Sequence, residues 1–246
     1  MQNSTAEQMS VPPAPLRFPF GTRALVKLLY LSRRLRGLHR YDEFIIERVH
    51  GVPILVAPSV FNPKRLRTGE FFASQLDEGV VGRESQVLDM GTGSGVCAVF
   101  AARYARRVVA VDLNAAAARC AGINALLNHL EHRIEVRHGD LFEPVAAERF
   151  DLILFNPPFL VGEPRNDRDR AWRATGVAER FAQGLGQHLK PGGAALLLLS
   201  TYGDPAVFLG ALLERNHRIF RVAQRRYLGE RLMLYRIMAG EAAGVA

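Results

Sequence analysis

Three glycines follow directly on an apolar segment, residues 86–90, and their spacing suits the binding of a nucleoside. Gly91, Gly93 and Gly95 alternate with small polar residues. Because glycine has no Cβ atom, such a turn lets the backbone approach a ligand closely. The spacing G-x-G-x-G differs from the G-x-G-x-x-G fingerprint of dinucleotide-binding proteins. The turn therefore predicts a cofactor cradle and argues against the nearest alternative, a nicotinamide-dependent dehydrogenase.

Three aspartates stand at the ends of three successive predicted strands, where open α/β sheets bind their ligands. Asp89 is placed to receive a cationic amino group, Asp112 to accept hydrogen bonds from ribose hydroxyls, and Asp140 to accept them from an adenine amino group. Each aspartate alone is also typical of a helix or turn cap. Together they favour a ligand with an amino acid, a ribose and an adenine, and S-adenosyl-L-methionine has all three.

A tetrapeptide after the predicted strand 150–155 could hold a flat nitrogen. It reads Asn156-Pro157-Pro158-Phe159. The Asn156 side-chain oxygen and the Pro157 carbonyl can both accept hydrogens of an –NH₂ group, and the Phe159 ring offers a face to a planar substrate. The alternative is a rigid turn with a core phenylalanine. Combined with the cofactor cradle, the tetrapeptide favours methyl transfer to nitrogen.

Short apolar strands alternate with helices, which is typical of a doubly wound, mostly parallel sheet covered on both faces. The pattern predicts an α/β, Rossmann-like fold with seven strands and an antiparallel closing hairpin, preceded by a small helix and a β-hairpin. The expected N-terminal hairpin covers residues 44–49 and 52–57. The expected sheet strands are 86–90, 107–112, 134–138, 150–155, 194–200, 218–226 and 231–238, and the expected helices are 71–79, 95–104, 115–128, 177–188 and 205–215.

Composition and charge divide the chain into three predicted parts: a disordered tail over residues 1–20, a basic helix and hairpin over 21–60, and the main domain over 61–246. The net charge of +8 is compatible with an RNA or ribosome-associated partner, or with genomic bias toward arginine. Two cysteines and scattered histidines predict no metal site. The absence of a signal peptide or long apolar run predicts a cytoplasmic protein without membrane contact.

These residues resemble class I S-adenosylmethionine-dependent methyltransferases that methylate nitrogen and carry an N-P-P-[YF] motif. Within that group, the chain looks most like the HemK-type glutamine N5-methyltransferases and the related methyltransferase small-domain proteins that act on RNA. The resemblance implies that Asn156 and Pro157 hold the acceptor nitrogen while Phe159 packs on it. The predicted cofactor-binding residues are, in full, Thr68, Asp89, Gly91, Thr92, Gly93, Gly95, Asp112, Leu113, Asp140, Leu141 and Asn156.

The acceptor is less well defined by the sequence than the cofactor. Residues 62–70 and Phe159 depart from the bacterial release-factor enzymes, which have P-R-P-E-T-E and usually Tyr there, and their N-terminal domain is longer. Pro158, Arg165 and Trp172 are predicted to contact substrate. A protein glutamine amide is slightly favoured, and the alternatives are a base amine of structured RNA or a non-catalytic RNA-binding protein with this fold.

Overall fold

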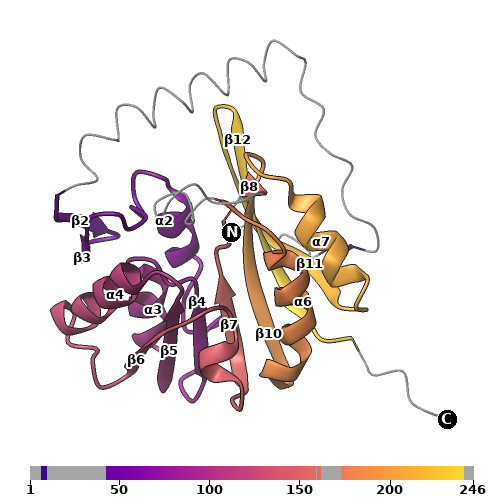
Figure 1. Cartoon of the computed structure of the whole chain (residues 1–246), viewed down its shortest axis with the longest axis horizontal. Helices are drawn as coiled ribbons and strands as arrows, with labels where there is room; N and C mark the ends of the chain where they lie inside the picture. The colour runs from indigo at the N-terminus through magenta and orange to yellow at the C-terminus, as the bar shows by residue number, and fades with distance from the viewer. Residues whose placement is uncertain (1–6, 10–42, 159, 162–172, 241–246) are drawn as a thin grey trace.

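The computed structural model describes residues 7–9, 43–158, 160–161 and 173–240 (Figure 1). Its centre is an eight-stranded sheet with the order β1-β11-β12-β10-β7-β4-β5-β6. Seven of these strands are the predicted ones, which confirms the mostly parallel α/β sheet. The strand bounds are β1 Glu7–Met9, β4 Gln86–Met90, β5 Arg107–Asp112, β6 Ile134–His138, β7 Phe150–Phe155, β10 Leu189–Ser200, β11 Arg218–Tyr227 and β12 Glu230–Met238.

The order of the strands places a switch point at the centre of the sheet. From β4 the chain builds outward through β5 and β6, then crosses back and places β7 on the other side of β4. β10 continues in parallel beside β7, and β12 lies antiparallel between β10 and β11. The predicted antiparallel closing hairpin is therefore confirmed. The crevice between β4 and β7 opens at their carboxyl ends, where ligands bind in such folds.

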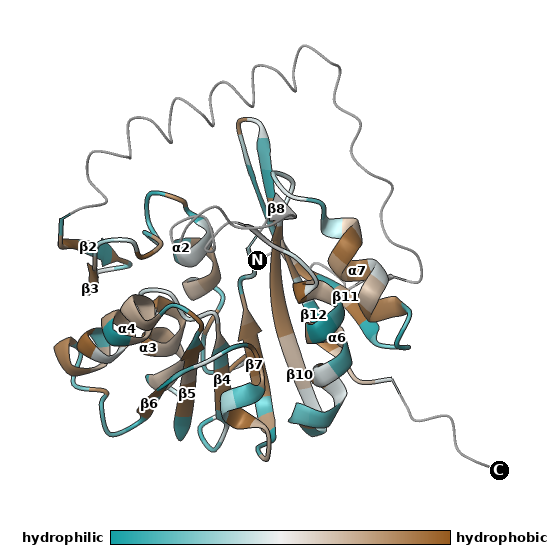
Figure 2. Cartoon of the chain, in the orientation of Figure 1, coloured by the Kyte–Doolittle hydropathy of each residue, from teal (hydrophilic) through white to brown (hydrophobic). Residues whose placement is uncertain are grey.

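Helices cover both faces of the sheet and bury two separate cores (Figures 1 and 2). One core lies under α2 and α3 and includes Phe72, Phe100 and Leu154. The other lies under α6 and α7 and includes Phe155, Phe181 and Tyr235. The helix bounds are α2 Thr68–Ala73, α3 Val96–Ala102, α4 Ala115–Leu127, α6 Val177–His188 and α7 Pro205–Leu213, with a 3-10 turn, η1, at Glu143–Val145.

The predicted N-terminal hairpin is present as β2 (Ile45–Val49) and β3 (Val52–Val56), which form a sheet of their own. Three side chains spaced four residues apart, two in α4 and one at its C-cap, take the place of a neighbouring strand at the free edge of β3. The amide of Asn124 accepts from the Leu55 N–H at 2.7 Å and donates to the Leu55 carbonyl at 2.6 Å. The Cys120 thiol donates a hydrogen bond to the Leu55 carbonyl and accepts one from the Ala57 N–H, and the Asn128 side chain donates to the carbonyl of Pro53. We call Cys120, Asn124 and Asn128 the polar ladder.

Three predicted segments differ from the structure. Glu7–Met9 pair antiparallel with the edge of β11, where the sequence predicts a disordered tail. α2 ends at Ala73 rather than near residue 79, because the Ser74 hydroxyl donates back to Phe71 and the following N–H groups bond three residues back. β10 begins at Leu189, which pairs with Phe150 before a register shift, rather than at residue 194.

Three further features of the sequence can be compared with the structure: membrane-spanning segments, the two cysteines and the basic helix. Within the described part of the chain, every helix is too short or too polar to cross a lipid bilayer. Both cysteines are free and buried. The predicted basic helix of residues 21–40 lies outside the described residues.

Candidate functional site

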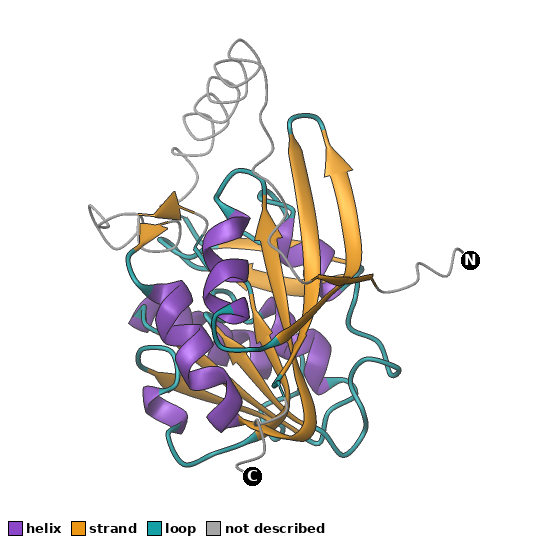
Figure 3. Ribbon diagram, turned by 90° about the vertical axis from the view of Figure 1, so that its right-hand side faces the viewer, coloured by secondary structure: helices purple, strands orange, loops and turns teal. Residues whose placement is uncertain are grey.

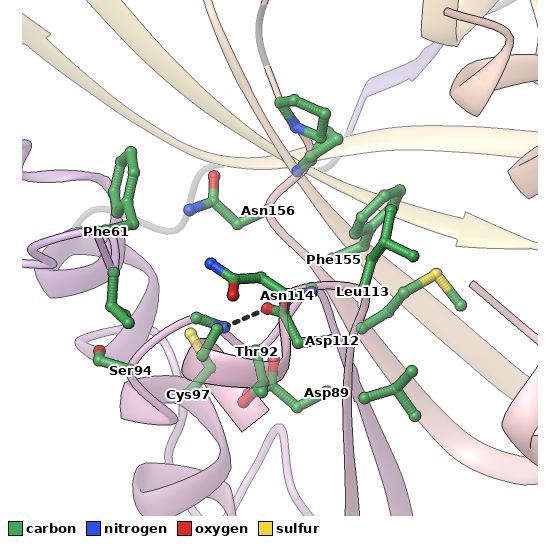
Figure 4. Close-up of a pocket in the computed structure, with 18 of the residues that line it drawn as sticks. Phe61, Asp89, Thr92, Ser94, Cys97, Asp112, Leu113, Asn114, Phe155 and Asn156 are labelled. Carbon is green, nitrogen blue, oxygen red and sulfur yellow. Dashed lines mark hydrogen bonds between the residues drawn. The ribbon is translucent and has the colours of Figure 1, made fainter. Parts of the chain in front are cut away.

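A cavity opens at the carboxyl ends of β4, β5 and β7, and most of the predicted cofactor-binding residues line it (Figure 4). Asp89 and Asp112 lie on one side, while Asn156 and Phe61 lie across from them. The lining also includes residues that the sequence did not single out: Ser59, Val60, Phe61, Pro63, Ser94, Cys97, Asn114, Ala117, Phe155, Val177 and Arg180. The switch point thus brings the predicted cradle and the predicted clamp into one site.

The three glycines of the turn have different roles. All three have positive φ values, of 63°, 57° and 79° for Gly91, Gly93 and Gly95. A Cβ atom on Gly93 would meet nothing within 4 Å, so this position leaves space open beside the cavity. A Cβ atom on Gly95 would lie 2.9 Å from the backbone of Ala121. Gly95 is therefore needed for the packing of α3 against α4. It was predicted to bind the cofactor, but it does not line the cavity.

Asp89 is 4% exposed and forms the floor of the cavity. Its Oδ2 accepts hydrogen bonds from the Thr92 hydroxyl at 2.6 Å and from the Ala98 N–H at 2.9 Å. Burial raises the pKa of Asp89 to about 7, and these two hydrogen bonds oppose that rise. A buried carboxylate at this position is stabilised by a cation, which is the property predicted for the contact with a ligand amino group.

Asp112 stands at the end of β5 and is tied to the turn after β4. Its Oδ2 accepts from the Gly93 N–H at 2.8 Å, and its Oδ1 accepts from the Asn114 N–H at 2.8 Å. Burial raises its pKa, against the effect of the two backbone hydrogen bonds. Each oxygen keeps a second lone pair for a hydroxyl group. The adjoining Leu113 is 47% exposed and lines the cavity, so it offers apolar surface to a flat ring.

Asp140 lines the cavity beyond the end of β6, but it already has a partner. Its Oδ2 accepts from Arg180 of α6 at 2.5 Å. Leu141, next in the chain, has a φ of 47° and also lines the cavity. An adenine amino group that bonds Asp140 would therefore share this carboxylate with the Arg180 guanidinium.

Asn156 follows β7 and carries an unusual polar atom. Its Nδ2 donates to the Thr68 hydroxyl at 3.4 Å. Its Oδ1 is buried and accepts no hydrogen bond from any described residue. Pro157 beside it is buried, and Pro158 lines the cavity. Thr68 is 1% exposed and lies behind Asn156 rather than in the cavity lining, so its geometry is that of a support for the amide.

A second cavity adjoins the first on the side of α6 and α7. The two share Pro158 and Val177, so the second cavity begins where the predicted clamp ends. Ser200, Asp204 and Phe208 are among its lining residues. Three predicted site residues, Phe159, Arg165 and Trp172, lie outside the described residues.

Asn124 is the main residue that the sequence reasoning missed. It is fully buried, and besides its bonds to Leu55 it donates to the carbonyl of Ser94 at 2.7 Å. Ser94 belongs to the glycine turn and lines the cavity, whereas Leu55 belongs to the N-terminal hairpin. One side chain thus joins the hairpin to the cradle. The available signal is an asparagine in the interior of the predicted helix 115–128, because asparagine is unfavourable there.

The donors and acceptors of the cavity suit a nucleoside that carries an amino acid. The cavity is lined by two buried carboxylates, an apolar wall and a glycine turn that leaves open space. Among the described residues there is no group of His, Cys, Asp and Glu side chains that could hold a metal ion.

Comparison with known proteins places the chain in a family. The family model of the methyltransferase small domain matches residues 51–224. The ribosomal RNA small subunit methyltransferase C of Alcanivorax borkumensis is 36% identical, over 57% of this chain and 40% of that protein. The release factor glutamine methyltransferase of Koribacter versatilis is 33% identical, over 68% of this chain and 69% of that protein.

A solved structure of another methyltransferase has a similar fold. The 16S rRNA N2 G1207 methyltransferase of T. thermophilus, in complex with AdoMet and guanosine, superposes with a TM-score of 0.56 at 25% identity, over 78% of this chain and 49% of that chain. This chain therefore spans about half the length or less of two of these three proteins. From the family match and the shared fold, the chain belongs to the methyltransferase small domain family of S-adenosylmethionine-dependent methyltransferases.

Proposed function

We propose that this protein transfers the methyl group of S-adenosylmethionine to a planar –NH₂ nitrogen held by Asn156 and Pro157. The observation that carries the proposal is the Oδ1 atom of Asn156, which is buried beside the cavity without a partner among the described residues. A buried acceptor that stays unpaired costs about 1–3 kcal/mol. Retaining such an atom next to a methyl-donor cavity supports a role in which a ligand supplies the missing hydrogen.

The chemistry explains why two acceptors suffice without a strong base. The bound cofactor supplies a methyl group already activated by its sulfonium. The acceptor nitrogen has its lone pair delocalised into a neighbouring π system. Hydrogen bonds from this –NH₂ group to Asn156 Oδ1 and to the Pro157 carbonyl favour a pyramidal nitrogen with its lone pair directed at the methyl carbon. The N–C bond forms as the C–S bond breaks, and the nitrogen releases one proton to water.

The cofactor is proposed to lie across the ends of β4, β5 and β6. Asp89 receives its amino group, Asp112 its ribose hydroxyls and Asp140 its adenine amino group. The support for these roles is the burial of Asp89 and Asp112 and the free lone pairs that their hydrogen bonds leave. A thermal shift on addition of S-adenosylhomocysteine tests this part. No stabilisation would instead favour a protein that kept the fold without the reaction.

Two acceptors carry a nitrogen of the required kind. A protein glutamine amide is supported by the relative named a release factor glutamine methyltransferase. An RNA base amine is supported by the two rRNA methyltransferases and by a basic hairpin beside the second cavity, described below. Both acceptors place the reaction in the cytoplasm, where translation takes place.

Labelled methyl transfer into a cell lysate separates these acceptors. The protein is incubated with S-adenosylmethionine carrying a labelled methyl group, and the product is divided between protease and ribonuclease treatment. Loss of label with protease alone assigns a polypeptide, and loss with ribonuclease alone assigns RNA. Absence of label from both fractions, in a protein that still binds S-adenosylhomocysteine, would contradict the proposed transfer.

A further inference from the structure

The closing hairpin extends beyond the rest of the sheet. β10 pairs with β12 only as far as Ser200 and Leu232, whereas β11 and β12 continue to pair through Arg226 with Arg231 and through Tyr227 with Glu230. This end projects past the carboxyl edge of the sheet (Figures 1 and 3). We call residues 225–231 the hairpin arm. Leu228 at its turn is 90% exposed.

Two arginines of the hairpin arm face each other in an unfavourable way. Arg226 and Arg231 are direct partners in the antiparallel register, so their side chains leave the same face of the hairpin. Like charges at directly opposite positions destabilise a strand pair. Neither arginine forms an ion pair with another described residue. This face of the arm therefore has positive charge that the described part of the protein does not neutralise.

Two more arginines are held on aromatic rings at the other face. The Arg67 guanidinium lies 4.6 Å from the centre of the Tyr227 ring, and the Arg225 guanidinium lies 5.3 Å from that of Phe71. Both contacts join the hairpin arm to the start of α2. A guanidinium stacked by its face keeps its N–H edge available for a phosphate. Among described residues neither arginine forms an ion pair, so these edges are not used by a carboxylate there.

The hairpin arm lies beside the acceptor side of the site. Arg67 directly precedes Thr68, whose hydroxyl accepts a hydrogen bond from Asn156. At the base of the arm, Glu230 is buried and accepts from Ser200, which lines the second cavity. Two nearby carboxylates are engaged within the protein: Glu230 with Ser200, and Glu47 with Asn62 and Arg65.

We propose that the hairpin arm and Arg67 bind the phosphate backbone of a structured RNA and direct one of its base amines to Asn156. This inference rests on the proposed methyl transfer, and it selects RNA over a polypeptide as the acceptor. Four guanidinium groups that form no ion pair among the described residues can each bind a phosphate, and their planar donor edges suit the phosphate oxygens. Phosphate contacts of this kind fix position and orientation, and the choice of base is left to the cavity.

Salt-dependent RNA binding tests the proposal. A fluorescent RNA stem–loop is titrated with the full-length protein at several salt concentrations, and anisotropy gives the dissociation constant. The variant Arg226→Gln/Arg231→Gln is compared with Arg83→Gln/Arg106→Gln, which loses the same charge from exposed sites preceding β4 and β5. We expect the arm variant to bind about tenfold more weakly and to lower the salt slope by about 2, with little change in the control. Equal effects of the two variants would overturn the proposal.

Methyl transfer separates this inference from the function on which it rests. Affinity for S-adenosylhomocysteine should be the same in both variants, which shows that each is folded. Loss of label from the RNA fraction in the arm variant alone supports the proposal. If the wild-type protein labels only polypeptide, and the arm variant does so at the same rate, RNA docking is refuted while the proposed transfer stands. If the wild-type protein labels neither, the proposed transfer itself fails.

Discussion

The two sides of the site differ in how far their polar groups are satisfied within the protein. On the cofactor side, Asp89 and Asp112 accept four hydrogen bonds from the adjoining turns and from α3. On the acceptor side, Asn156 Oδ1 accepts no hydrogen bond and the opposed Arg226 and Arg231 form no ion pair among the described residues. The side proposed to hold the cofactor is thus fixed by its own hydrogen bonds, whereas the side proposed to hold the acceptor keeps an unmet hydrogen bond and charge that a substrate could satisfy.

This difference has a physical basis. A small cofactor gives up little surface on binding, so the geometry of its site must be fixed beforehand by the protein. A macromolecular acceptor supplies many contacts and can compensate for local penalties of a few kcal/mol such as an unpaired acceptor or a like-charge pair. Substitutions on the two sides should therefore change different measurements.

The largest expected effect is on the acceptor side. Asn156→Ala removes the Oδ1 acceptor, and we expect kcat to fall by roughly 100-fold or more because the transition state loses a directed hydrogen bond. Affinity for S-adenosylhomocysteine, measured by calorimetry, should change little. Thr68→Ser keeps the hydroxyl behind Asn156 and serves as the control, with kcat close to that of the wild type. Near wild-type transfer by Asn156→Ala would show that the comparison between the two sides is wrong.

An intermediate effect is expected from the polar ladder. Asn124→Ala leaves the Leu55 N–H, the Leu55 carbonyl and the Ser94 carbonyl without this partner, so unfolding free energy should fall by about 2–5 kcal/mol. Asn128→Ala removes the side-chain donor from the Pro53 and Asn124 carbonyls, but the Asn124 carbonyl still accepts from the backbone N–H of residue 128, so the substitution should cost about 1–2 kcal/mol. Denaturant unfolding measures both values.

The same pair of variants separates cofactor binding from overall stability. Because Ser94 lines the cavity, Asn124→Ala should also weaken S-adenosylhomocysteine binding, whereas Asn128→Ala should not. Equal affinities in the two variants at a temperature where both are folded would mean that the ladder only supports the hairpin.

The smallest expected effect is a pH dependence on the cofactor side. Burial raises the pKa of Asp89 to about 7, and a cationic amino group binds the ionised form. Below pH 7 the carboxyl must therefore lose a proton on binding, so affinity for S-adenosylhomocysteine should rise about tenfold from pH 6 to pH 8 and level off above pH 7. Calorimetry at several pH values measures this change in affinity.

A matched variant identifies the titrating group. Asp89→Asn keeps an oxygen for Thr92 and Ala98 but has no proton to release, so its affinity should be lower and independent of pH in this range. A pH dependence that persists in Asp89→Asn would assign the titration to another residue.

The sequence predicted those features that depend on residues close together in the chain. Apolar runs that end at glycine, aspartate or asparagine defined β4, β5 and β7, and the topology of such sheets brought Asp89, Asp112 and Asn156 together. Features that depend on distant partners were missed. Asn124 meets Leu55 across 69 residues, and Arg180 meets Asp140 across 40. No local pattern specifies which side chain satisfies a distant backbone group, so these contacts required the structure.

The glycine turn shows the same limit within a single motif. The sequence treats Gly91, Gly93 and Gly95 alike, because all three suit a tight turn. Only the position of α4 shows that Gly95 makes room for Ala121 while Gly93 faces open space. Spacing thus identified the turn, and tertiary packing shows which glycine faces open space and which makes room for a neighbouring helix.

The polar ladder also has a consequence for the behaviour of the protein at high concentration. A free strand edge is a template for pairing with another molecule, and an isolated two-stranded hairpin is marginally stable. Cys120, Asn124 and Asn128 occupy the hydrogen-bonding groups along one edge of β3, so that edge is closed to intermolecular strand addition. Side chains of a helix thereby protect the hairpin from aggregation. The segment that follows the hairpin can then contribute to the cavity wall.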